Sequence, residues 1–261
     1  MKPVTNESII EVENLTIGFE QDGEETVLLQ DVSFQVRRGE VFAILGGSGS
    51  GKSTLLKHMI GLLQPLAGRI AIDGDDIVTA DRAQRRSIMS KFGVMYQMGA
   101  LFGSMSTLEN VRLPLEEFTA FDHDAIDLIA RTKLHLVGLS AAVHRAPADL
   151  SGGMQKRAAM ARAMALDPAI LFLDEPSAGL DPITSADLDR LIVRLARTLG
   201  ITFVVVTHEL PSIFAIANRV IMLDQQTQGI IAAGTPAQLR ERNDNPWVHR
   251  FFNRESEEAL P

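Results

Sequence analysis

Apolar and polar positions alternate in a regular order through the second half of the chain. From Ser151 the order is a helix to Leu166, strand Ile170–Leu173, helix Ile183–Leu199, strand Ile201–Thr207, helix Glu209–Ala217 and strand Val220–Leu223. Asp181-Pro182 and Thr235-Pro236 each place a capping residue before a proline at the first helical position. Strands that alternate with helices predict a parallel β-sheet covered by helices, and therefore an α/β fold.

The first half of the chain begins with strand signals and then becomes helical. The expected strands are Ile9–Ile17, Val27–Val36, Arg69–Ile72 and Phe92–Tyr96, with turns at Gln21–Glu25 and Asp73-Gly74. Helices are expected at Ala80–Ser90 and from Thr107 to about Ala142. Within the second segment, Pro114 and Gly138 are the expected interruptions. We therefore expect a β-rich N-terminal subdomain and an α-helical subdomain inserted over roughly residues 98–165. Both belong to a domain of residues 1–242, followed by a C-terminal tail of residues 243–261.

Composition narrows the class of protein. The chain has 261 residues, is 46% hydrophobic and carries a formal net charge of −8, so it is globular and has no nucleic acid as a partner. It has no cysteine, which excludes disulfides and thiolate chemistry. The polar stretch Met1–Glu11 does not have the pattern of a secretory signal, and no apolar run approaches the ~18 residues of a membrane span.

The strongest chemical signal is the stretch Gly46-Gly47-Ser48-Gly49-Ser50-Gly51-Lys52-Ser53-Thr54, between an apolar strand and a helix. It matches the phosphate-loop pattern G-x-x-x-x-G-K-[ST] in the context that the pattern requires. Its glycines allow backbone N–H groups to point inward around phosphate oxygens. Lys52 can then reach the β- and γ-phosphates, and the Ser53 hydroxyl can ligate Mg²⁺. A Gly/Ser turn is the alternative interpretation, but the flanking strand and helix favour a nucleotide site.

A second signal stands where the strand Ile170–Leu173 ends in Asp174 and Glu175. Ligands meet the carboxyl ends of strands in open α/β sheets. Asp174 is therefore expected to hold Mg²⁺, directly or through water, and Glu175 to polarise an attacking water. Two solvated acids at a strand end are the alternative, which the phosphate loop upstream makes less favourable.

A third signal is Ser151-Gly152-Gly153 at the start of a predicted helix. A serine and two glycines at a helix N-terminus form an anion site, although an ordinary helix cap has the same appearance. The phosphate loop already holds the phosphates within this chain, so the natural user of this second site is the nucleotide on another copy of the protein.

Together these motifs resemble the ATPase subunit of ABC transporters over roughly Ile9–Gly234. The resemblance implies a P-loop NTPase (RecA-like) core with the β-rich and helical subdomains described above, and ATP and Mg²⁺ as cofactors. It implies a head-to-tail dimer in which Ser151–Met154, the signature, caps the γ-phosphate at Lys52 of the second copy.

The same resemblance assigns the remaining site residues. Gln97 resembles the glutamine that senses Mg²⁺ and the attacking water, and Ser177–Asp181 resembles the D-loop at the dimer interface. His208 resembles the switch histidine that contacts the γ-phosphate. Two departures stand out: Met154 replaces the usual glutamine of the signature, and Phe19 is the best candidate for the aromatic that stacks on adenine.

Within this group, Gln97–Phe102, Leu150–Met154 and Asn245–Phe252 resemble the Mla/MCE type of lipid transporter. That resemblance implies an integral membrane permease and an MCE-domain lipid-binding protein as partners, phospholipid as cargo, and a position on the cytoplasmic face of the inner membrane. The apolar residues from 98 to 105 are either ordinary core or a groove that receives a permease helix. Other functions left open are ATPase for a different small solute, a non-transport ABC ATPase, and a P-loop kinase or GTPase.

The tail carries Trp247, Val248, Phe251 and Phe252, which form one apolar face if the segment is helical. A short amphipathic helix folds only against a surface. That surface is either the second ATPase copy, which would help hold the pair together, or the chain's own domain.

Overall fold

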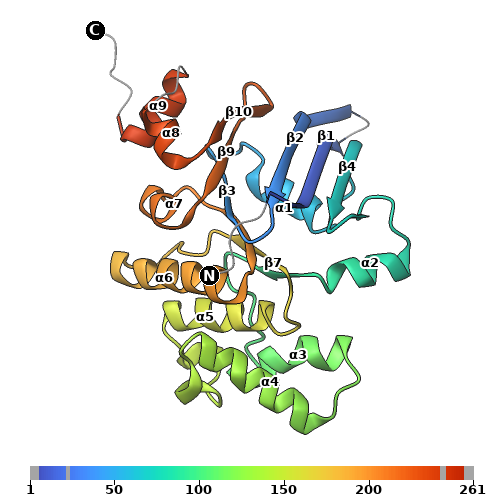
Figure 1. Cartoon of the computed structure of the whole chain (residues 1–261), viewed down its shortest axis with the longest axis vertical. Helices are drawn as coiled ribbons and strands as arrows, with labels where there is room; N and C mark the ends of the chain where they lie inside the picture. Colours follow the sequence, from blue (N-terminus) through green and yellow to red (C-terminus); the bar gives the residue numbers. More distant parts are fainter. Residues whose placement is uncertain (1–5, 22–23, 242–244, 256–261) are drawn as a thin grey trace.

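The computed structural model describes residues 6–21, 24–241 and 245–255, which form two β-sheets flanked by helices (Figure 1). The strands are β1 (Ser8–Gln21), β2 (Glu24–Arg37), β3 (Val41–Gly46), β4 (Ala67–Ile72), β5 (Asp75–Asp76), β6 (Phe92–Met95), β7 (Ile170–Asp174), β8 (Thr202–Val206), β9 (Arg219–Asp224) and β10 (Gly229–Gly234). The helices are α1 (Lys52–Met59), α2 (Arg82–Met89), α3 (Thr107–Phe118), α4 (His123–Leu136), α5 (Gly152–Ala163), α6 (Pro182–Leu199), α7 (Leu210–Ile216), α8 (Pro236–Glu241) and α9 (Pro246–Asn253). In the described part of the chain, none of them combines the length and the apolar character of a bilayer span.

The larger sheet has six strands in the order β10-β9-β3-β8-β7-β6, and all pairs except β10 with β9 are parallel. Every residue of β3, β7 and β8 is buried. Along β7, Leu171 and Leu173 enter the core shared with α5 and α6, whereas Ile170 and Phe172 enter the core shared with α1 and β1. The sheet is covered on both faces, which confirms the predicted α/β class.

The smaller sheet is antiparallel, with the order β2-β1-β4-β5. It packs on α1 through a core that includes Ile10 and Leu15 of β1 and Leu56 of α1. The strands predicted at Ile9–Ile17 and Val27–Val36 are present, and both extend further toward the turn between them. The centre of that turn, residues 22 and 23, lies outside the described residues. The helix α1 is thus held between the two sheets.

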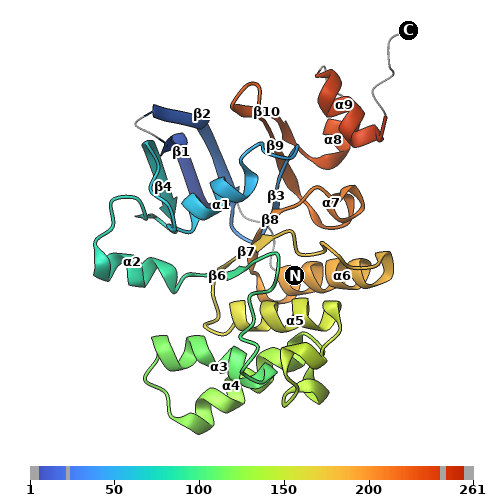
Figure 2. The ribbon, with the colours of Figure 1, turned by 180° about the vertical axis from the view of Figure 1, so that it is seen from behind.

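The segment between β6 and α5 is helical and lies at one end of the molecule, opposite the smaller sheet and α9 (Figures 1 and 2). Ser106 and Glu109 form a capping box at the start of α3. Pro114, expected to interrupt a helix, lies inside α3. The helix continues because Val111 and Leu115, on either side of the proline, are buried against α4 and α5, which outweighs the lost hydrogen bond.

The predicted elements of the second half all appear, with ends that differ by a few residues. The helix expected to reach Leu166 ends at Ala163, and Asp181 caps α6 by accepting hydrogen bonds from the N–H groups of Ile183 and Thr184. The division into a domain of residues 1–242, an inserted subdomain over 98–165 and a tail of 243–261 stays a prediction, and residues 242–244 and 256–261 lie outside the described residues.

The tail forms the helix α9, which packs on the chain's own domain. Its cap Asn245 accepts hydrogen bonds from the N–H groups of Trp247 and Val248. Val248 and Phe252 are buried, and the Phe252 ring stands edge-on to Phe214 of α7 at 6.1 Å between centroids. Of the two surfaces left open by the sequence, the structure thus shows the chain's own domain, where β9, β10, α7 and α8 leave apolar side chains for α9 to cover.

We predict that Phe252→Ala destabilises the protein by about 3 kcal/mol, because it leaves a cavity under α9. For a chain of this length that loss lowers the thermal unfolding midpoint by about 6–12 °C, as followed by circular dichroism. The control is Phe121→Ala, which removes a ring that is 55% exposed and is expected to shift the midpoint little. Equal, small shifts in the two variants would show that α9 does not pack as described.

Candidate functional site

The phosphate loop joins the buried strand β3 to α1. Gly46 has a φ of +151°, and a Cβ there would lie 2.3 Å from Ser50 Oγ and 2.6 Å from the carbonyl oxygen of Leu223. Only glycine fits that position, and the chain can therefore curl tightly toward α1. The Lys52 ammonium donates to the carbonyl oxygens of Gly46 at 2.9 Å and Gly47 at 2.7 Å. The lysine is thus folded over the loop that it closes.

Partial burial lowers the pKa of Lys52, and the negative charges of Glu175 and Asp174 oppose that shift. The two carboxylates belong to the end of β7, so strand end and phosphate loop act on each other electrostatically. Of the remaining predicted loop residues, Ser48, Gly49, Ser50 and Gly51 lie between β3 and α1, and Thr54 lies in the first turn of α1.

Ser53 and Asp174 come together from α1 and β7. The Ser53 hydroxyl donates to Asp174 Oδ1 at 3.2 Å. Burial raises the pKa of Asp174, and the hydrogen bond from Ser53 acts in the opposite direction. A hydroxyl and one carboxylate, with phosphate oxygens and waters, are the ligands by which Mg²⁺ is usually held at nucleotide sites, so these residues fit that ion. The described residues contain no cluster of three or more His, Asp or Glu that could hold a metal by themselves.

Glu175 and His208 form the second pair of the site. His208 Nδ1 lies 2.8 Å from Glu175 Oε1, while Glu175 Oε2 is buried without a hydrogen-bond partner among the described residues. Glu175 has a φ of +47°, a left-handed conformation that is unusual for this residue, and its N–H donates to Val206 of β8 at 2.8 Å. The carboxylate is therefore held on one oxygen and has a free acceptor on the other.

Gln97, Ser151 and Phe19 lie apart from this cluster. Gln97 is exposed just after β6, and Phe19 is half-exposed near the end of β1. Ser151 caps α5 by accepting a hydrogen bond from the Met154 N–H at 3.3 Å, and Gly152 and Gly153 form the first turn of that helix. Within the described residues, no hydrogen bond or ion pair joins these groups to the phosphate loop.

Two contacts of the site were not foreseen from the sequence. The buried Lys156 donates to the carbonyl oxygen of Gln97 and, at 3.4 Å, to that of Glu175. Trp247 of α9 flanks the phosphate loop, since a Cβ added at Gly47 would lie 3.6 Å from its Cζ2. The residue types gave no signal for either contact. A lysine in a helix is ordinarily exposed, and the tail is distant in sequence from the loop.

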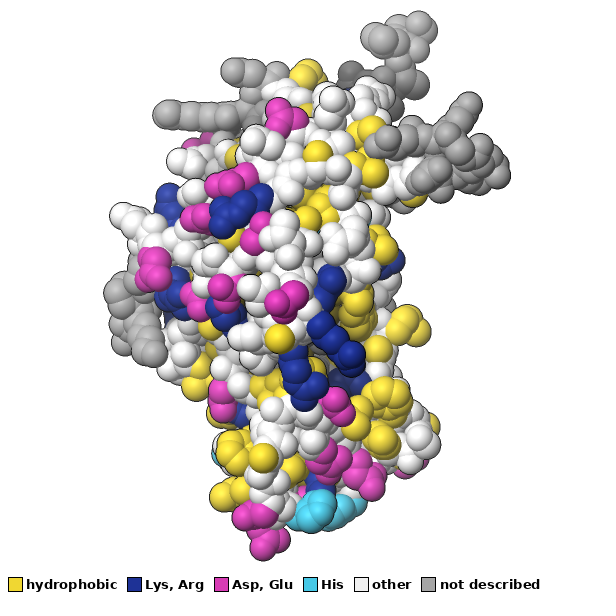
Figure 3. All heavy atoms as spheres, turned by 90° about the vertical axis from the view of Figure 1, so that its right-hand side faces the viewer, with side chains coloured by type: hydrophobic (Ala, Val, Ile, Leu, Met, Phe, Trp, Pro, Cys, Tyr) yellow, Lys and Arg dark blue, Asp and Glu magenta, His cyan; other side chains and the backbone are white. Residues whose placement is uncertain are grey.

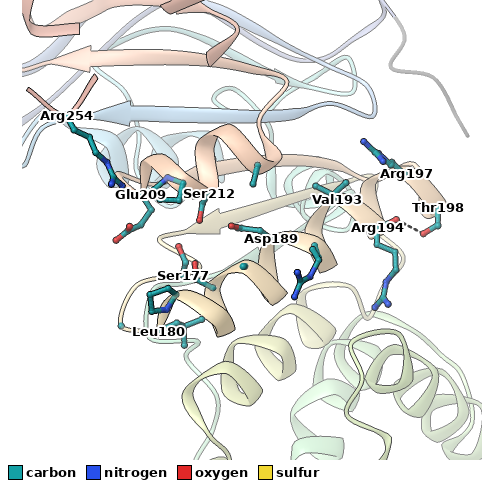
Figure 4. Close-up of a pocket in the computed structure, with 17 residues that line it drawn as sticks. Ser177, Leu180, Asp189, Val193, Arg194, Arg197, Thr198, Glu209, Ser212 and Arg254 are labelled. Carbon is teal, nitrogen blue, oxygen red and sulfur yellow. Dashed lines mark hydrogen bonds between the residues drawn. The ribbon is translucent and has the colours of Figure 1, made fainter. Parts of the chain in front are cut away.

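A cavity of about 1110 Å³ lies beside this cluster, between α6 and α7 (Figure 4). Ser177 and Leu180, from the predicted D-loop, line one end, and Arg194 and Arg197 of α6 line the other. Glu209, the neighbour of His208, also borders it. Neither Lys52 nor Ser53 lines this cavity, so it is separate from the phosphate loop.

Fold and site together define a P-loop ATPase of the cassette type. The family model described as "ABC transporter" matches residues 29–178, more than half of the chain, and the chain belongs to that family. The fold agrees: a dimeric post-hydrolysis structure of the ATP-binding cassette MJ0796 bound to ADP and Pi superposes with a TM-score of 0.78 at 30% identity, covering 87% of this chain and 98% of that one. The cbiO1 structure from Clostridium perfringens superposes with a TM-score of 0.80 at 30% identity, covering 88% and 90%.

Similar curated proteins are named for transport. The chain is 40% identical to the intermembrane phospholipid transport system ATP-binding protein MlaF of Haemophilus influenzae, over 92% of this chain and 88% of that protein. It is 38% identical to MlaF of Escherichia coli, over 90% and 86%. It is also 39% identical to a probable ribonucleotide transport ATP-binding protein, mkl, of Mycobacterium leprae, over 94% and 68%. The predicted resemblance to ABC ATPases, most like the Mla type, is confirmed.

Trp247 is the chain's single tryptophan, so its fluorescence reports on the loop at Gly47. Phosphates are expected to replace the carbonyls of Gly46 and Gly47 as partners of Lys52, which repositions the loop beside the indole. We predict a saturable change in emission on addition of Mg·ATP, measured by titration. The matched Lys52→Ala variant should show no change at the same concentrations. Constant emission while a labelled nucleotide demonstrably binds would contradict the contact.

Proposed function

We propose that this chain is the ATP-hydrolysing subunit of an ABC transporter that moves phospholipid through a separate membrane permease. The observation that carries the catalytic part is the pairing of Glu175 with His208 at 2.8 Å, beside the Ser53–Asp174 pair at the end of the same strand. The MlaF proteins support phospholipid as the cargo. The mkl protein supports a second candidate, transport of another small solute.

The residues of this chain divide the reaction among them. The loop N–H groups and Lys52 bind the β- and γ-phosphates, while Ser53 and Asp174 hold Mg²⁺. The ion, when bound, neutralises charge that develops on the phosphates. Glu175 accepts a proton from the attacking water at its free Oε2, and His208 fixes the other oxygen of that carboxylate. Gln97 senses the metal and the water.

A second copy of the chain completes each site in this proposal. Ser151, Gly152 and Gly153 present a capped helix N-terminus that makes no hydrogen bond to the loop of their own chain, so they can serve the γ-phosphate of another. The dimeric MJ0796 cassette supports this arrangement. Phe19, which is 49% exposed, is available to stack on adenine.

The loop after β6 offers a surface for the permease. Met98 is 87% exposed, and Phe102 beside it is half-exposed. On the side of the molecule that carries α2, hydrophobic side chains lie next to a group of basic ones (Figure 3). An exposed apolar patch with a charged border is typical of a protein interface. We propose that a permease helix binds at Met98 and Phe102. In that arrangement the chain lies on the cytoplasmic face of the inner membrane, and an MCE-domain protein is a further partner.

We predict that Glu175→Gln lowers turnover by ~10²–10⁴-fold, the usual share of a general base, with ATP affinity close to normal. The amide keeps the shape and the contact with His208 but loses the basic oxygen. ATP joins the two copies and hydrolysis separates them, so this variant should also accumulate as an ATP-bound dimer. Phosphate release and size-exclusion chromatography with light scattering test both points. Turnover near the wild-type rate would remove Glu175 from the role of base, and slow turnover without a dimer would separate chemistry from dimer opening.

We further predict that the chain purifies with a multi-span permease and an MCE-domain protein when the neighbouring reading frames are expressed with it. Lipid extracted from that complex and identified by mass spectrometry should be phospholipid. The control complex carries Met98→Glu, which places a charge in the apolar patch and should weaken assembly while leaving the isolated subunit's ATP turnover intact. A complex that holds a nucleotide or another polar solute would instead favour the second candidate.

A further inference from the structure

Lys156 is a buried cation that the catalytic roles above do not use. It lies in α5, five residues after the cap Ser151, and is 8% exposed. Its ammonium donates to two backbone carbonyl oxygens, those of Gln97 and Glu175. One partner follows β6 and the other follows β7. A single side chain of the signature helix is therefore bonded to two loops of the nucleotide site.

Placing a lysine there has an energetic cost. Burial lowers the pKa of Lys156, and the charges of Glu175 and Asp174 oppose that shift. A buried ammonium is tolerated only when its hydrogen bonds are made, and an apolar side chain would pack at this position without any such cost. The other buried lysine among the described residues, Lys133 of α4, shows the ordinary solution, because it bonds the carboxylate of Asp167 at the surface. Lys156 instead bonds the backbone of functional residues.

These bonds act on the orientation of the glutamate. The N–H of Glu175 donates to Val206, its carbonyl accepts from Lys156, and its backbone is in the left-handed region. With both backbone polar groups engaged, the peptide cannot relax to a commoner conformation without losing a hydrogen bond, and the side chain is directed accordingly. The same carbonyl also accepts from the N–H of Ala178 at 3.2 Å, and His208 contacts the carboxylate itself. Lys156 is thus one of several restraints on the direction of the carboxylate, and the one that comes from α5.

The loop after β6 is held by the same helix at a second point. Arg162, six residues beyond Lys156, donates to the carbonyl oxygens of Gly99 at 2.9 Å and Ala100 at 2.7 Å. The loop from Gln97 to Ala100 is therefore bonded to α5 at both ends. A displacement of this loop must move α5 or break these bonds.

We propose that Lys156 is a positioning residue that links three parts of the site: the signature helix α5, the loop at Gln97 and the catalytic Glu175. A partner that moves the loop at Gln97 thereby changes the direction of Glu175 and the placement of Ser151 together. The inference rests on the proposed ATPase function. It assigns to Lys156 the connection between the loop at Gln97 and ATP hydrolysis at Glu175.

The test compares Lys156→Met with Lys133→Met in the full-length chain. Both changes remove a buried ammonium at similar size, but only the first touches the site. We expect Lys156→Met to lower kcat by roughly 10- to 100-fold, the scale of a small misplacement of a catalytic group, with KM for ATP within about threefold of wild type. Lys133→Met should leave kcat within about twofold, whatever it does to the unfolding midpoint.

A conservative variant guards against misfolding. Lys156→Gln keeps a donor for one carbonyl, and its kcat should lie between those of Lys156→Met and the wild type. Trp247 emission on addition of Mg·ATP shows that each variant still binds nucleotide. An unchanged kcat in Lys156→Met, or an equal loss in Lys133→Met, would overturn the inference. Wild-type turnover that survives Lys52→Ala would instead overturn the proposed function, so the two failures are distinguishable.

Discussion

Four charged side chains share a partly buried cluster at the carboxyl end of β7, and their balance constrains the elements around them. Lys52 and Lys156 come from α1 and α5, and Asp174 and Glu175 from the strand end. Burial lowers the pKa of both lysines and raises that of Asp174, whereas the opposite charges act the other way. None of these groups is stable there alone. The apolar cores on the two faces of the sheet must therefore hold α1 and α5 in register with β7.

In the proposed dimer, the cluster of one chain is only half of a site. The Ser53–Asp174 and Glu175–His208 pairs are assembled, while Ser151, Gly152 and Gly153 at the start of α5 make no hydrogen bond to them within the described residues. Under that proposal, the loop of a single chain binds the phosphates, and hydrolysis requires a second chain. Lys156 lies in the helix that Ser151 caps, but its ammonium bonds the backbone of Glu175 in the assembled cluster.

The sequence allowed prediction wherever a residue's role follows from its neighbours in the chain. The phosphate loop, the Asp174-Glu175 strand end and the alternating elements all have local patterns, and the structure has them where expected. Pro114 was misjudged because its helix is maintained by packing against other elements. The burial of Lys156 and the contact of Trp247 with Gly47 depend on segments far apart in the chain, for which no local pattern exists. The roles of the site residues remain proposals derived from motif and geometry.

The contact between α9 and the phosphate loop joins two segments that are far apart in the polypeptide. Gly47 is synthesised 200 residues before Trp247, so the loop leaves the ribosome well before α9 does. During synthesis the loop can form from β3 and α1, but its outer wall is absent until the final helix has emerged and settled over β9 and β10. The newly made chain thus keeps the phosphate loop open on this side while the 200 residues between Gly47 and Trp247 are synthesised.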